Sequence, residues 1–391
     1  MSVRLRAGIF FAVFVALVVS GHAYLVARLA WQPALPGALP VWSAALLTLL
    51  GLNVLLQPFL RQHAFPGSRW VTSAAYFWFG ASFLWLTSLL LWELPALLWA
   101  GDAATFRALA GSATFVLALA WALWRALGPP PIRRVDIALD GWPAALDGFR
   151  IAQLSDLHIS RRRGASFARR LVRRTNRLEA DLVVITGDLV DGSVEALGAS
   201  ARPLAELRAP GGVFLVTGNH DHYSGADPWC AYWSALGVRP LRNERTTIRR
   251  SGASFELAGV DDHRGEWSQG STCDLPRALA DWSGEEPLVL LAHDPATFSA
   301  AGAAGVHLQL SGHTHGGQIW PFHAAVRAVT PYVSGLYRRG KSTLYVSRGT
   351  GFWGPPLRFG APPEITLLTI RGSGGTARSG GDPGKDCRDA A

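Results

Sequence analysis

The segment LSDLHIS, residues 154–160, places an aspartate and a histidine directly after a short apolar run. Four later segments repeat this arrangement: TGD at 186–188, TGNHD at 217–221, AHD at 292–294 and SGHTH at 311–315. The preceding runs are short and apolar or β-branched, which is typical of buried strands. They predict strands at 149–155, 182–186, 212–217, 288–292 and 307–311. The polar side chains then lie on loops at strand ends, where a sheet holds them rigidly.

The clusters supply imidazole and carboxylate side chains but no thiolate. Such nitrogen and oxygen ligands suit divalent manganese, iron or zinc. Two ions about 3.5–4 Å apart clamp the attacking and leaving oxygens of a phosphoryl group, and they lower the pKa of bound water. Asp156 and Asp188 offset only half the charge of two divalent ions, so the centre stays positive. The clusters therefore predict a two-metal hydrolase centre for an anionic phosphate substrate.

The blocks LSDLHIS, ITGDLVDG, VTGNHDHY, LLAHDP and LSGHTHGGQIWP, in this order, resemble those of the calcineurin-like metallophosphoesterases. The resemblance covers roughly residues 148–371. It is nearer to bacterial phosphoesterases whose last block reads GHTHGGQ, followed by a segment like residues 344–370. The family fold implies an α/β domain in which two mixed β-sheets are sandwiched and flanked by helices.

The resemblance also implies a role for each polar residue of the blocks. The ligands it implies are Asp156, His158 and His315 for the first metal, Asp188 for both, and Asn219, His293 and His313 for the second. His220 is then the general acid that faces the leaving-group oxygen, and Asp221 orients or polarises it. A histidine suits this role because its pKa lies near neutrality.

Outside this ordered set, the same residue types have simpler explanations. Asp191 and Asp294 are expected at most to support the ligands from behind, and His222 is expected at the surface. The remaining histidines are expected to be structural or exposed: His22, His63, His263, His307 and His323. A histidine such as His293, taken alone after a strand, is more often packed than metal-bound.

The segment RGTGFWGPPLR, residues 348–358, combines guanidinium groups with bulky apolar ones. We expect Arg348, Trp353 and Arg358 to bind the phosphate and the apolar part of a substrate. The N-terminal region is predicted to cross a membrane, as described next, and this would place the site near a bilayer. Together with that position, the composition favours an amphiphilic phosphate ester or pyrophosphate, such as a phospholipid or a nucleotide-linked lipid precursor. The sequence leaves the choice between monoester and diester open.

The first 128 residues contain apolar segments that each have about the 20 residues needed to cross a bilayer. Four transmembrane helices are predicted, at 7–27, 41–60, 71–92 and 108–127. Alternatively, the first is a signal peptide, because Arg4 and Arg6 precede it. Tryptophans at 78, 85, 92 and 99 recur every seven residues and predict a helix-packing face or interfacial anchors rather than a ligand groove.

Arginines set the expected orientation of these spans. One side carries more of them than the other: Arg4, Arg6, Arg61, Arg69, Arg125, Arg133 and Arg134, against Arg28 and Arg107. By the positive-inside rule, the richer side is cytoplasmic. The sequence thus predicts a multi-pass protein of the cell (inner) membrane, with its catalytic domain in the cytoplasm.

Gly128 and three prolines separate the membrane region from a domain at 129–371, because proline cannot continue a helix. Residues 372–391 are rich in Gly, Ser, Asp and Arg and are expected to be disordered. The three cysteines stand at unrelated spacings, which argues against a disulfide framework.

The expected partners are a membrane and a phosphorylated small molecule or lipid, with no protein partner implied.

Two alternatives remain open. A net charge of +9 and an arginine cluster at 161–163, 169–170 and 173–174 are compatible with a nuclease, with binding to an anionic leaflet, or with a solvated helix face. Nucleic acid is the less expected partner. The domain is alternatively a non-catalytic membrane scaffold, although no ligand of the implied set is missing.

Overall fold

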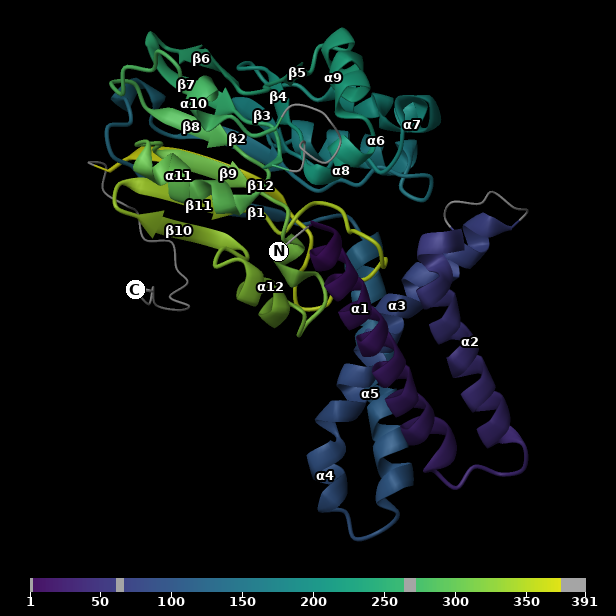
Figure 1. Ribbon diagram of the computed structural model, residues 1–391. Coiled ribbons are helices and arrows are strands. Elements are labelled where there is room, and N and C mark those ends of the chain that lie inside the picture. Colours follow the sequence, from purple (N-terminus) through teal and green to yellow (C-terminus); the bar gives the residue numbers. More distant parts are fainter. Residues whose placement is uncertain (1–2, 61–66, 264–271, 374–391) are drawn as a thin grey trace.

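The five predicted strands form the centres of two six-stranded mixed sheets in the computed structural model, which describes residues 3–60, 67–263 and 272–373. The first sheet has the order β1-β12-β2-β3-β4-β5 and the second β10-β11-β9-β8-β7-β6. The five runs become β2 (Phe149–Leu154), β3 (Leu182–Thr186), β4 (Val213–Val216), β8 (Leu288–Leu291) and β9 (Leu308–Ser311). Figure 1 shows the two sheets stacked above a group of long helices.

The other strands complete the two sheets. Their bounds are β1 Ile132–Leu139, β5 Arg239–Pro240, β6 Glu244–Arg250, β7 Ala253–Gly259, β10 Gly335–Arg339, β11 Ser342–Val346 and β12 Ile365–Gly372. β2, β3 and β4 are parallel, as are β7, β8 and β9. Because parallel strands end at the same edge of a sheet, the loops that follow β2, β3 and β4 lie together.

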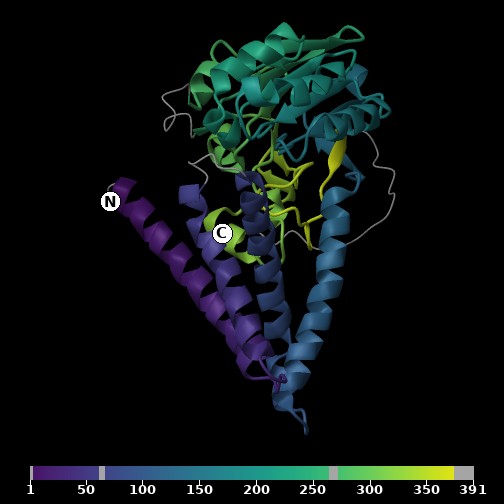
Figure 2. The ribbon, with the colours of Figure 1, turned by 90° about the vertical axis from the view of Figure 1, so that its right-hand side faces the viewer.

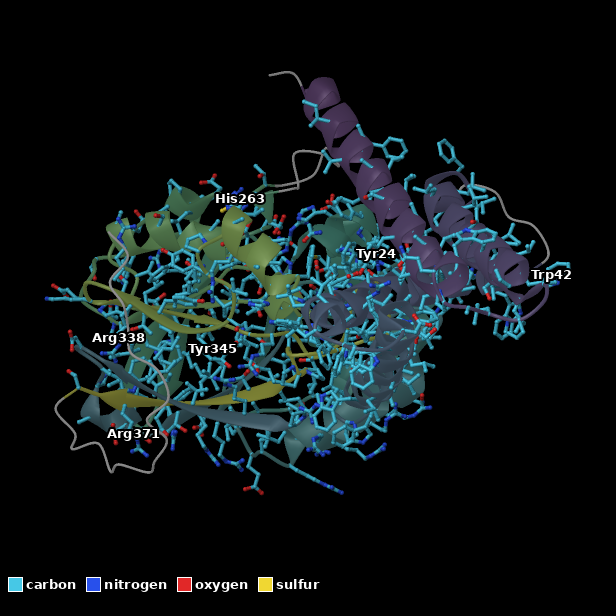
Figure 3. The ribbon with its side chains drawn as sticks, turned by 90° about the horizontal axis from the view of Figure 1, so that it is seen from below. Tyr24, Trp42, His263, Arg338, Tyr345 and Arg371 are labelled. Carbon is cyan, nitrogen blue, oxygen red and sulfur yellow. The ribbon has the colours of Figure 1, made fainter. Side chains whose placement is uncertain are left out.

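The main core lies between the two sheets. Ile151 and Val184 of the first sheet pack with Leu257 and Leu310 of the second, and all four are buried. Burying one such side chain contributes about 1.5–3 kcal/mol. Tyr345 also lies in this layer, as Figure 3 shows. The sandwich expected from the family resemblance is confirmed.

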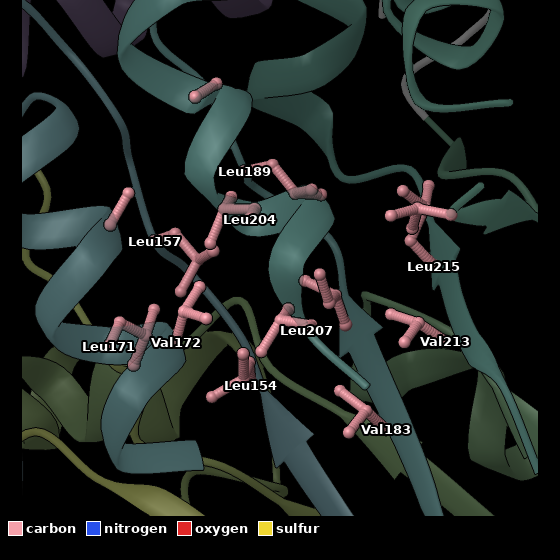
Figure 4. Packing of buried hydrophobic residues seen from close by; sticks show 14 of the residues in the cluster. Leu154, Leu157, Leu171, Val172, Val183, Leu189, Leu204, Leu207, Val213 and Leu215 are labelled. Atoms are coloured by element: carbon pink, nitrogen blue, oxygen red, sulfur yellow. The ribbon is translucent and has the colours of Figure 1, made fainter. Parts of the chain in front are cut away.

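Helices cover the outer faces of the sandwich. A second core joins the first sheet to α6 (Ala165–Asn176), α7 (Val194–Ala201) and α9 (Ala226–Ala235). Figure 4 shows Leu171 and Val172 of α6 facing Leu154 of β2. The remaining short helices of the domain are α8 Asn219–Tyr223, α10 Leu275–Ala278, α11 Phe298–Ala303 and α12 His323–Val329.

The N-terminal region contains four helices long and apolar enough to cross a membrane, as predicted. They are α1 (Val3–Val26, continued by a π-helical turn at Ala27–Trp31), α2 (Leu39–Leu60), α3 (Ser68–Leu91) and α5 (Ala103–Leu127), with the short α4 (Glu93–Leu97) before α5. Figure 2 shows these helices running down from the α/β domain. Trp42 of α2 is 70% exposed and points away from the bundle in Figure 3.

The predicted tryptophan face is a packing face. The indole nitrogens of Trp78, Trp85 and Trp92 donate to His22 of α1 and to Ser112 and Thr114 of α5, at 2.9, 3.2 and 2.9 Å. Trp99 lies beyond α3 and stacks on Phe106 of α5, with the ring centroids 4.3 Å apart. Each tryptophan therefore fixes one helix against another.

The α/β domain and the helices share one contact region. Ile319 and Leu357 are buried in the same apolar cluster as Leu84 and Phe115 of the helices. The backbone N–H of Arg358 donates to the carbonyl oxygen of Ala122 in α5 at 3.1 Å. The segment that follows β11 is thus packed between the sandwich and the bundle. The predicted disordered tail, apart from Gly372 and Ser373, lies outside the described residues, as does His63.

Candidate metal centre

Five loops at the carboxyl ends of β2, β3, β4, β8 and β9 converge at one end of the sandwich, the end on the side of the helices (Figure 1). They assemble side chains whose ligand atoms lie within 4.8 Å of one another, in two groups made of predicted ligands and a third made of His158, Asp191 and His220. Asp156, His158 and His315 form one group. Asp188, His293 and His313 form the other. Six of the seven ligands that the family resemblance implies belong to these two groups, and their role in metal binding stays a proposal.

Asp188 lies between the two groups. Its Oδ2 atom is 3.7 Å from Nε2 of His158 and 3.3 Å from Nε2 of His293. Nε2 of His315 is 3.1 Å from Nε2 of His158 and 3.3 Å from Oδ1 of Asp156. Asp188 therefore lies between a histidine of one group and a histidine of the other.

The backbone at the ligands is strained. Five of them have a left-handed φ: Asp156 (54°), His158 (46°), Asp188 (54°), His313 (72°) and His315 (52°). Each such residue costs of order 1–3 kcal/mol, and strain of this kind clusters at functional sites. Glycine is required at position 312, directly before His313, because a Cβ there would lie 1.9 Å from Oγ of Ser155. The fold is thus built to hold these side chains close together.

The donors fit a pair of metal ions. The amide oxygen of Asn219 is buried and has no hydrogen-bond partner in the described structure, a situation that costs about 1–3 kcal/mol unless a ligand satisfies the atom. Nδ1 of His293 lies 2.8 Å from the carbonyl oxygen of Thr186. Since a carbonyl only accepts, Nδ1 carries a proton, which is the backbone contact typical of a metal-ligating histidine. Nε2 lies 3.3 Å from Oδ2 of Asp188 and 3.2 Å from Nδ1 of His313.

The protonation states bear on metal binding in both directions. Burial lowers the pKa of His293, but the charge of Asp188 outweighs it and raises this pKa well above its ordinary value, so a metal at this ring has to displace a proton. Burial and then the positive charge of Arg358 lower the pKa of His315 well below its ordinary value, so the ring is neutral, as a ligand must be. Burial opposes ionisation of Asp188, but the neighbouring His293 outweighs it and the pKa of this carboxyl lies well below its usual range. Asp188 is therefore anionic at neutral pH.

His220 is held by Asp191 and not by Asp221, whose negative charge contributes only to raising the pKa of the ring. Nδ1 of His220 lies 2.8 Å from Oδ1 of Asp191, which is also 3.0 Å from Nδ1 of His158. Burial lowers the pKa of His220, but the bond with Asp191 and the charge of Asp188 outweigh it and raise the pKa above its ordinary value.

Asp221 instead fixes two of the loops. Its Oδ1 accepts from the backbone N–H groups of Leu189 and Val190, at 2.9 and 3.2 Å, and its Oδ2 from that of Gly218 at 2.9 Å. Burial, followed by the charge of Asp188, raises its pKa to about 7. Both Asp191 and Asp221 belong to the motif segments, and the sequence alone does not show which of the two contacts the ring of His220.

Arg358 is buried with no exposed surface, so the prediction that it binds substrate is wrong. Its guanidinium donates to the carbonyl oxygens of Gly351, Arg348 and His315, at 3.0, 2.8 and 2.8 Å, and lies 2.9 Å from Nδ1 of His315. It has no carboxylate partner within salt-bridge distance among the described residues. Arg358 therefore holds the His315 loop in place from behind.

Arg348 and Trp353, the other two residues predicted to bind substrate, remain accessible to a substrate. Arg348 is half-buried, and Trp353 is 50% exposed with its ring centroid 5.9 Å from that of His220. Their role in substrate binding stays a proposal. His222, expected at the surface, is buried, with Nε2 3.1 Å from Oγ1 of Thr217.

Arg163 is a supporting residue that the sequence did not distinguish from its neighbours. It is buried, and it donates to the carbonyl oxygens of Leu157 and Phe352 at 2.8 and 3.0 Å. Burial, then the charge of Arg358, lowers its pKa to about 9. The predicted arginine cluster therefore loses this member, whereas Arg161 and Arg162 are exposed.

Comparison with known proteins agrees with this geometry. Residues 149–317 match the calcineurin-like phosphoesterase family. An uncharacterised metallophosphoesterase of Helicobacter pylori is 37% identical to the chain, over 66% of the chain and 69% of that protein. The chain belongs to the calcineurin-like phosphoesterase family.

Two further relatives are similar to the chain, and one of them is a transmembrane protein by name. A bovine "transmembrane protein with metallophosphoesterase domain" is 38% identical over 68% of the chain, and the chain spans 62% of that protein's length. YkuE of Bacillus subtilis, an uncharacterised metallophosphoesterase, is 35% identical over 59% of the chain and 81% of its own length.

Two solved structures resemble the α/β domain at low identity. One is the phosphopantetheinyl hydrolase of Mycobacterium tuberculosis, with 12% identity, coverage of 59% and 100% of the two chains, and a TM-score of 0.35. The other is a dimetal phosphatase from Danio rerio, with 15% identity, coverage of 57% and 99%, and a TM-score of 0.35.

Proposed function

We propose that this protein is a membrane-anchored, two-metal phosphoesterase that hydrolyses the phosphate ester or pyrophosphate of an amphiphilic molecule. The observation that carries the proposal is the position of Asp188 between two groups of metal ligands, with His220 beside them. The backbone N–H of His220 donates to Oδ1 of Asp188 at 2.8 Å, so the general acid and the bridging ligand are held by one contact.

The chain supplies sites for two divalent ions of manganese, iron or zinc. Asp156, His158 and His315 would hold one, Asn219, His293 and His313 would hold the other, and Asp188 would contribute to both. When bound, such a pair polarises the phosphoryl oxygens and supplies hydroxide at neutral pH. His220 keeps a proton, because Asp191 raises its pKa, and it delivers that proton from Nε2 to the leaving-group oxygen.

The surroundings of His220 favour a substrate with an apolar part. The rings of Tyr223 and Trp353 lie 5.5 and 5.9 Å from the ring of His220, and both side chains are about half exposed. The segment that carries Trp353 packs directly on the helices through Leu357. A phospholipid or a nucleotide-linked lipid precursor therefore fits this site better than a small soluble ester.

The proposed location is the cell (inner) membrane, with the α/β domain on the cytoplasmic side. The arginine distribution between the four spans supports this side. Arg170 and Arg174 of α6 line a small pocket with Pro129 and Pro130 at the end of α5, so the basic face of α6 lies near the membrane exit. There it can meet anionic headgroups. Labelling of an introduced Ser251→Cys by a membrane-impermeant maleimide tests the side: labelling only after permeabilisation supports the cytoplasm, and labelling in intact cells contradicts it.

The substrate class is tested with the full-length protein in mixed detergent micelles containing manganese. We expect phosphate release from a phosphatidic acid or a lipid-linked pyrophosphate to follow the surface concentration of the substrate. Trp353→Ala is expected to lower kcat/KM for the lipid and to leave p-nitrophenyl phosphate hydrolysis nearly unchanged. Leu336→Ala, which changes an exposed side chain away from His220, is the control. Equal losses on both substrates in Trp353→Ala would contradict an apolar subsite at this residue.

A further inference from the structure

Helix α12 of the α/β domain is apolar, yet none of its residues is buried. Its sequence is HAAVRAV, and Trp320 and Phe322 precede it. Phe322 is 51% exposed, and Val329, at its end, is 89% exposed. In water, such a cluster of apolar side chains on a domain surface marks an interaction site. The helix therefore needs a covering that the domain itself does not provide.

The apolar surface of α12 continues into the membrane helices. The ring of Phe322 contacts the ring of Phe83 in α3, with centroids 6.4 Å apart and the planes nearly perpendicular. Ile319, just before this segment, is buried in the apolar cluster of the bundle. Figures 1 and 2 both show α12 on the side of the domain that faces the helices. What surrounds α3 at this level therefore also surrounds α12.

The contacts along α3 give the depth of this level. Arg162 lies over the ring of Tyr76, with Cζ 5.8 Å from the ring centroid. An exposed arginine belongs at the headgroups or in water, so we infer that Tyr76, six residues into the apolar stretch Trp70–Leu91, lies at headgroup level. Phe83 follows seven residues later, which is about 10 Å along the helix axis. Phe322 therefore lies below the headgroups, at the depth of about 5–10 Å that interfacial helices reach.

The same helix is connected to the metal ligands. The chain turns at His315–Gly317 directly into the segment before α12. A Cβ on Gly317 would lie 2.4 Å from Cα of His323, so α12 begins in close backbone contact with that turn. Any depth imposed on α12 is thus imposed on the loop that carries His313 and His315.

We propose that residues 320–329 form an interfacial anchor that inserts into the leaflet next to the α/β domain and holds the metal centre at the level of the lipid headgroups. The occupant of the exposed face of α12 is the acyl-chain region of that leaflet. Arg327, the one charged side chain of the helix, is exposed and extends to the phosphates. The anchor is separate from the four spans. It rests on the membrane attachment in the proposed function, not on the hydrolysis.

Depth measurement by spin labelling tests the anchor. Val329→Cys is introduced into the full-length protein after replacement of Cys230 by Ala and of Cys273 and Cys387 by Ser, and the labelled protein is placed in phosphatidylcholine vesicles. Two positions calibrate the scale: Leu117→Cys, 73% exposed on α5, for lipid, and Ser251→Cys, on the β6–β7 turn, for water. Ala325→Cys gives a second reading on α12, should the first variant fold poorly.

The readout is the collision rate of each label with oxygen, which concentrates in lipid, relative to a water-soluble nickel complex. We expect the ratio at Val329→Cys to exceed that at Ser251→Cys several-fold and to approach that at Leu117→Cys. A ratio equal to that at Ser251→Cys overturns the anchor. Low rates with both reagents also overturn it, because α12 is then covered by another copy of the chain. No substrate is involved, so an inactive protein leaves the result interpretable.

Discussion

Oδ1 of Asp191 lies 2.8 Å from Nδ1 of His220, and the same atom lies 3.0 Å from Nδ1 of His158. One carboxylate oxygen therefore orients both the proposed general acid and a ligand of the first metal. Because Nδ1 of each ring faces Asp191, the Nε2 atom of each ring lies on the opposite side, toward the candidate metal centre. The side chain of Asp191 thus fixes the position of the proposed general acid relative to the candidate metal site.

Asp191→Asn is predicted to lower kcat within the roughly 10²–10⁴-fold range that a positioned general acid contributes. The alkaline limb of the rate profile should also move. The pKa of His220 is raised in the native protein, so the acid stays protonated to higher pH and the rate falls as pH rises through that pKa. Loss of the Asp191 charge lowers this pKa and shifts the limb to lower pH.

The pH profile is measured at saturating manganese, so that weaker binding at His158 does not contribute. Asp136→Asn, which neutralises an exposed carboxylate on β1, is the matched control and should leave the profile in place. An Asp191→Asn variant with a lower kcat but an unmoved alkaline limb would show that Asp191 does not tune His220.

Asn219→Ala is predicted to lose one of two bound ions without loss of the fold. The amide oxygen of Asn219 has no partner in the described structure, so its removal breaks no hydrogen bond of that oxygen to the protein. Metal content by mass spectrometry should fall from about two ions per chain toward one. Asn176→Ala, whose side chain bonds only backbone groups at Glu206 and Arg208, should keep both ions. Unchanged metal content in Asn219→Ala would remove this residue from the ligand set.

Arg358→Lys and Arg348→Gln are predicted to affect different quantities, metal affinity in the first and KM in the second. Lysine has no planar fork and does not replace the bonds of Arg358 to Gly351, Arg348 and His315. Metal affinity should fall about 10- to 100-fold, as for other groups that support a ligand from behind. Arg348→Gln should instead raise KM and leave the metal affinity near that of the wild type. Equilibrium dialysis and steady-state kinetics on the same preparations distinguish the two, and a pure KM effect in Arg358→Lys would contradict its role.

Two glycines offer a matched test of the packing around the site. A Cβ on Gly351 would lie 1.9 Å from Nη1 of Arg163 and 2.5 Å from the carbonyl oxygen of Leu157, so Gly351→Ala should lower the melting temperature and the activity. A Cβ on Gly302 of α11 would make an ordinary 3.7 Å contact with Ser342. Gly302→Ala should be neutral or stabilising by up to about 1 kcal/mol, because alanine favours the helix. Similar melting temperatures for the two variants would contradict the tight packing at Gly351.

The sequence predicted the central strands and the four membrane helices because both depend on local apolar patterns. The family resemblance also implied the side chains that the two groups bring together, since the motifs follow one another in the family's order. It did not predict the partners of side chains from distant segments. Nothing local shows that Asp191 rather than Asp221 reaches His220, or that Arg358 is buried while Trp353 is exposed.

The contact between the α/β domain and the membrane helices is also not predicted by the local sequence pattern. Residues 320–329 are too short to be recognised as a span, and their depth depends on a contact between Phe322 and Phe83, far apart in the chain. The helical periodicity of α3 predicted a packing face but not that a loop of the α/β domain joins it through Leu357. Such contacts are decided by the tertiary structure.

The central claim is tested most directly by hydrolysis of bis-p-nitrophenyl phosphate and p-nitrophenyl phosphate by the full-length protein, with manganese or with a chelator, beside Asp188→Asn and His220→Ala. The account predicts metal-dependent turnover, lost in both variants, with bound metal reduced only in Asp188→Asn. Full turnover in the presence of chelator, or an Asp188→Asn variant that retains both metal and activity, would contradict a two-metal phosphoesterase centred on Asp188.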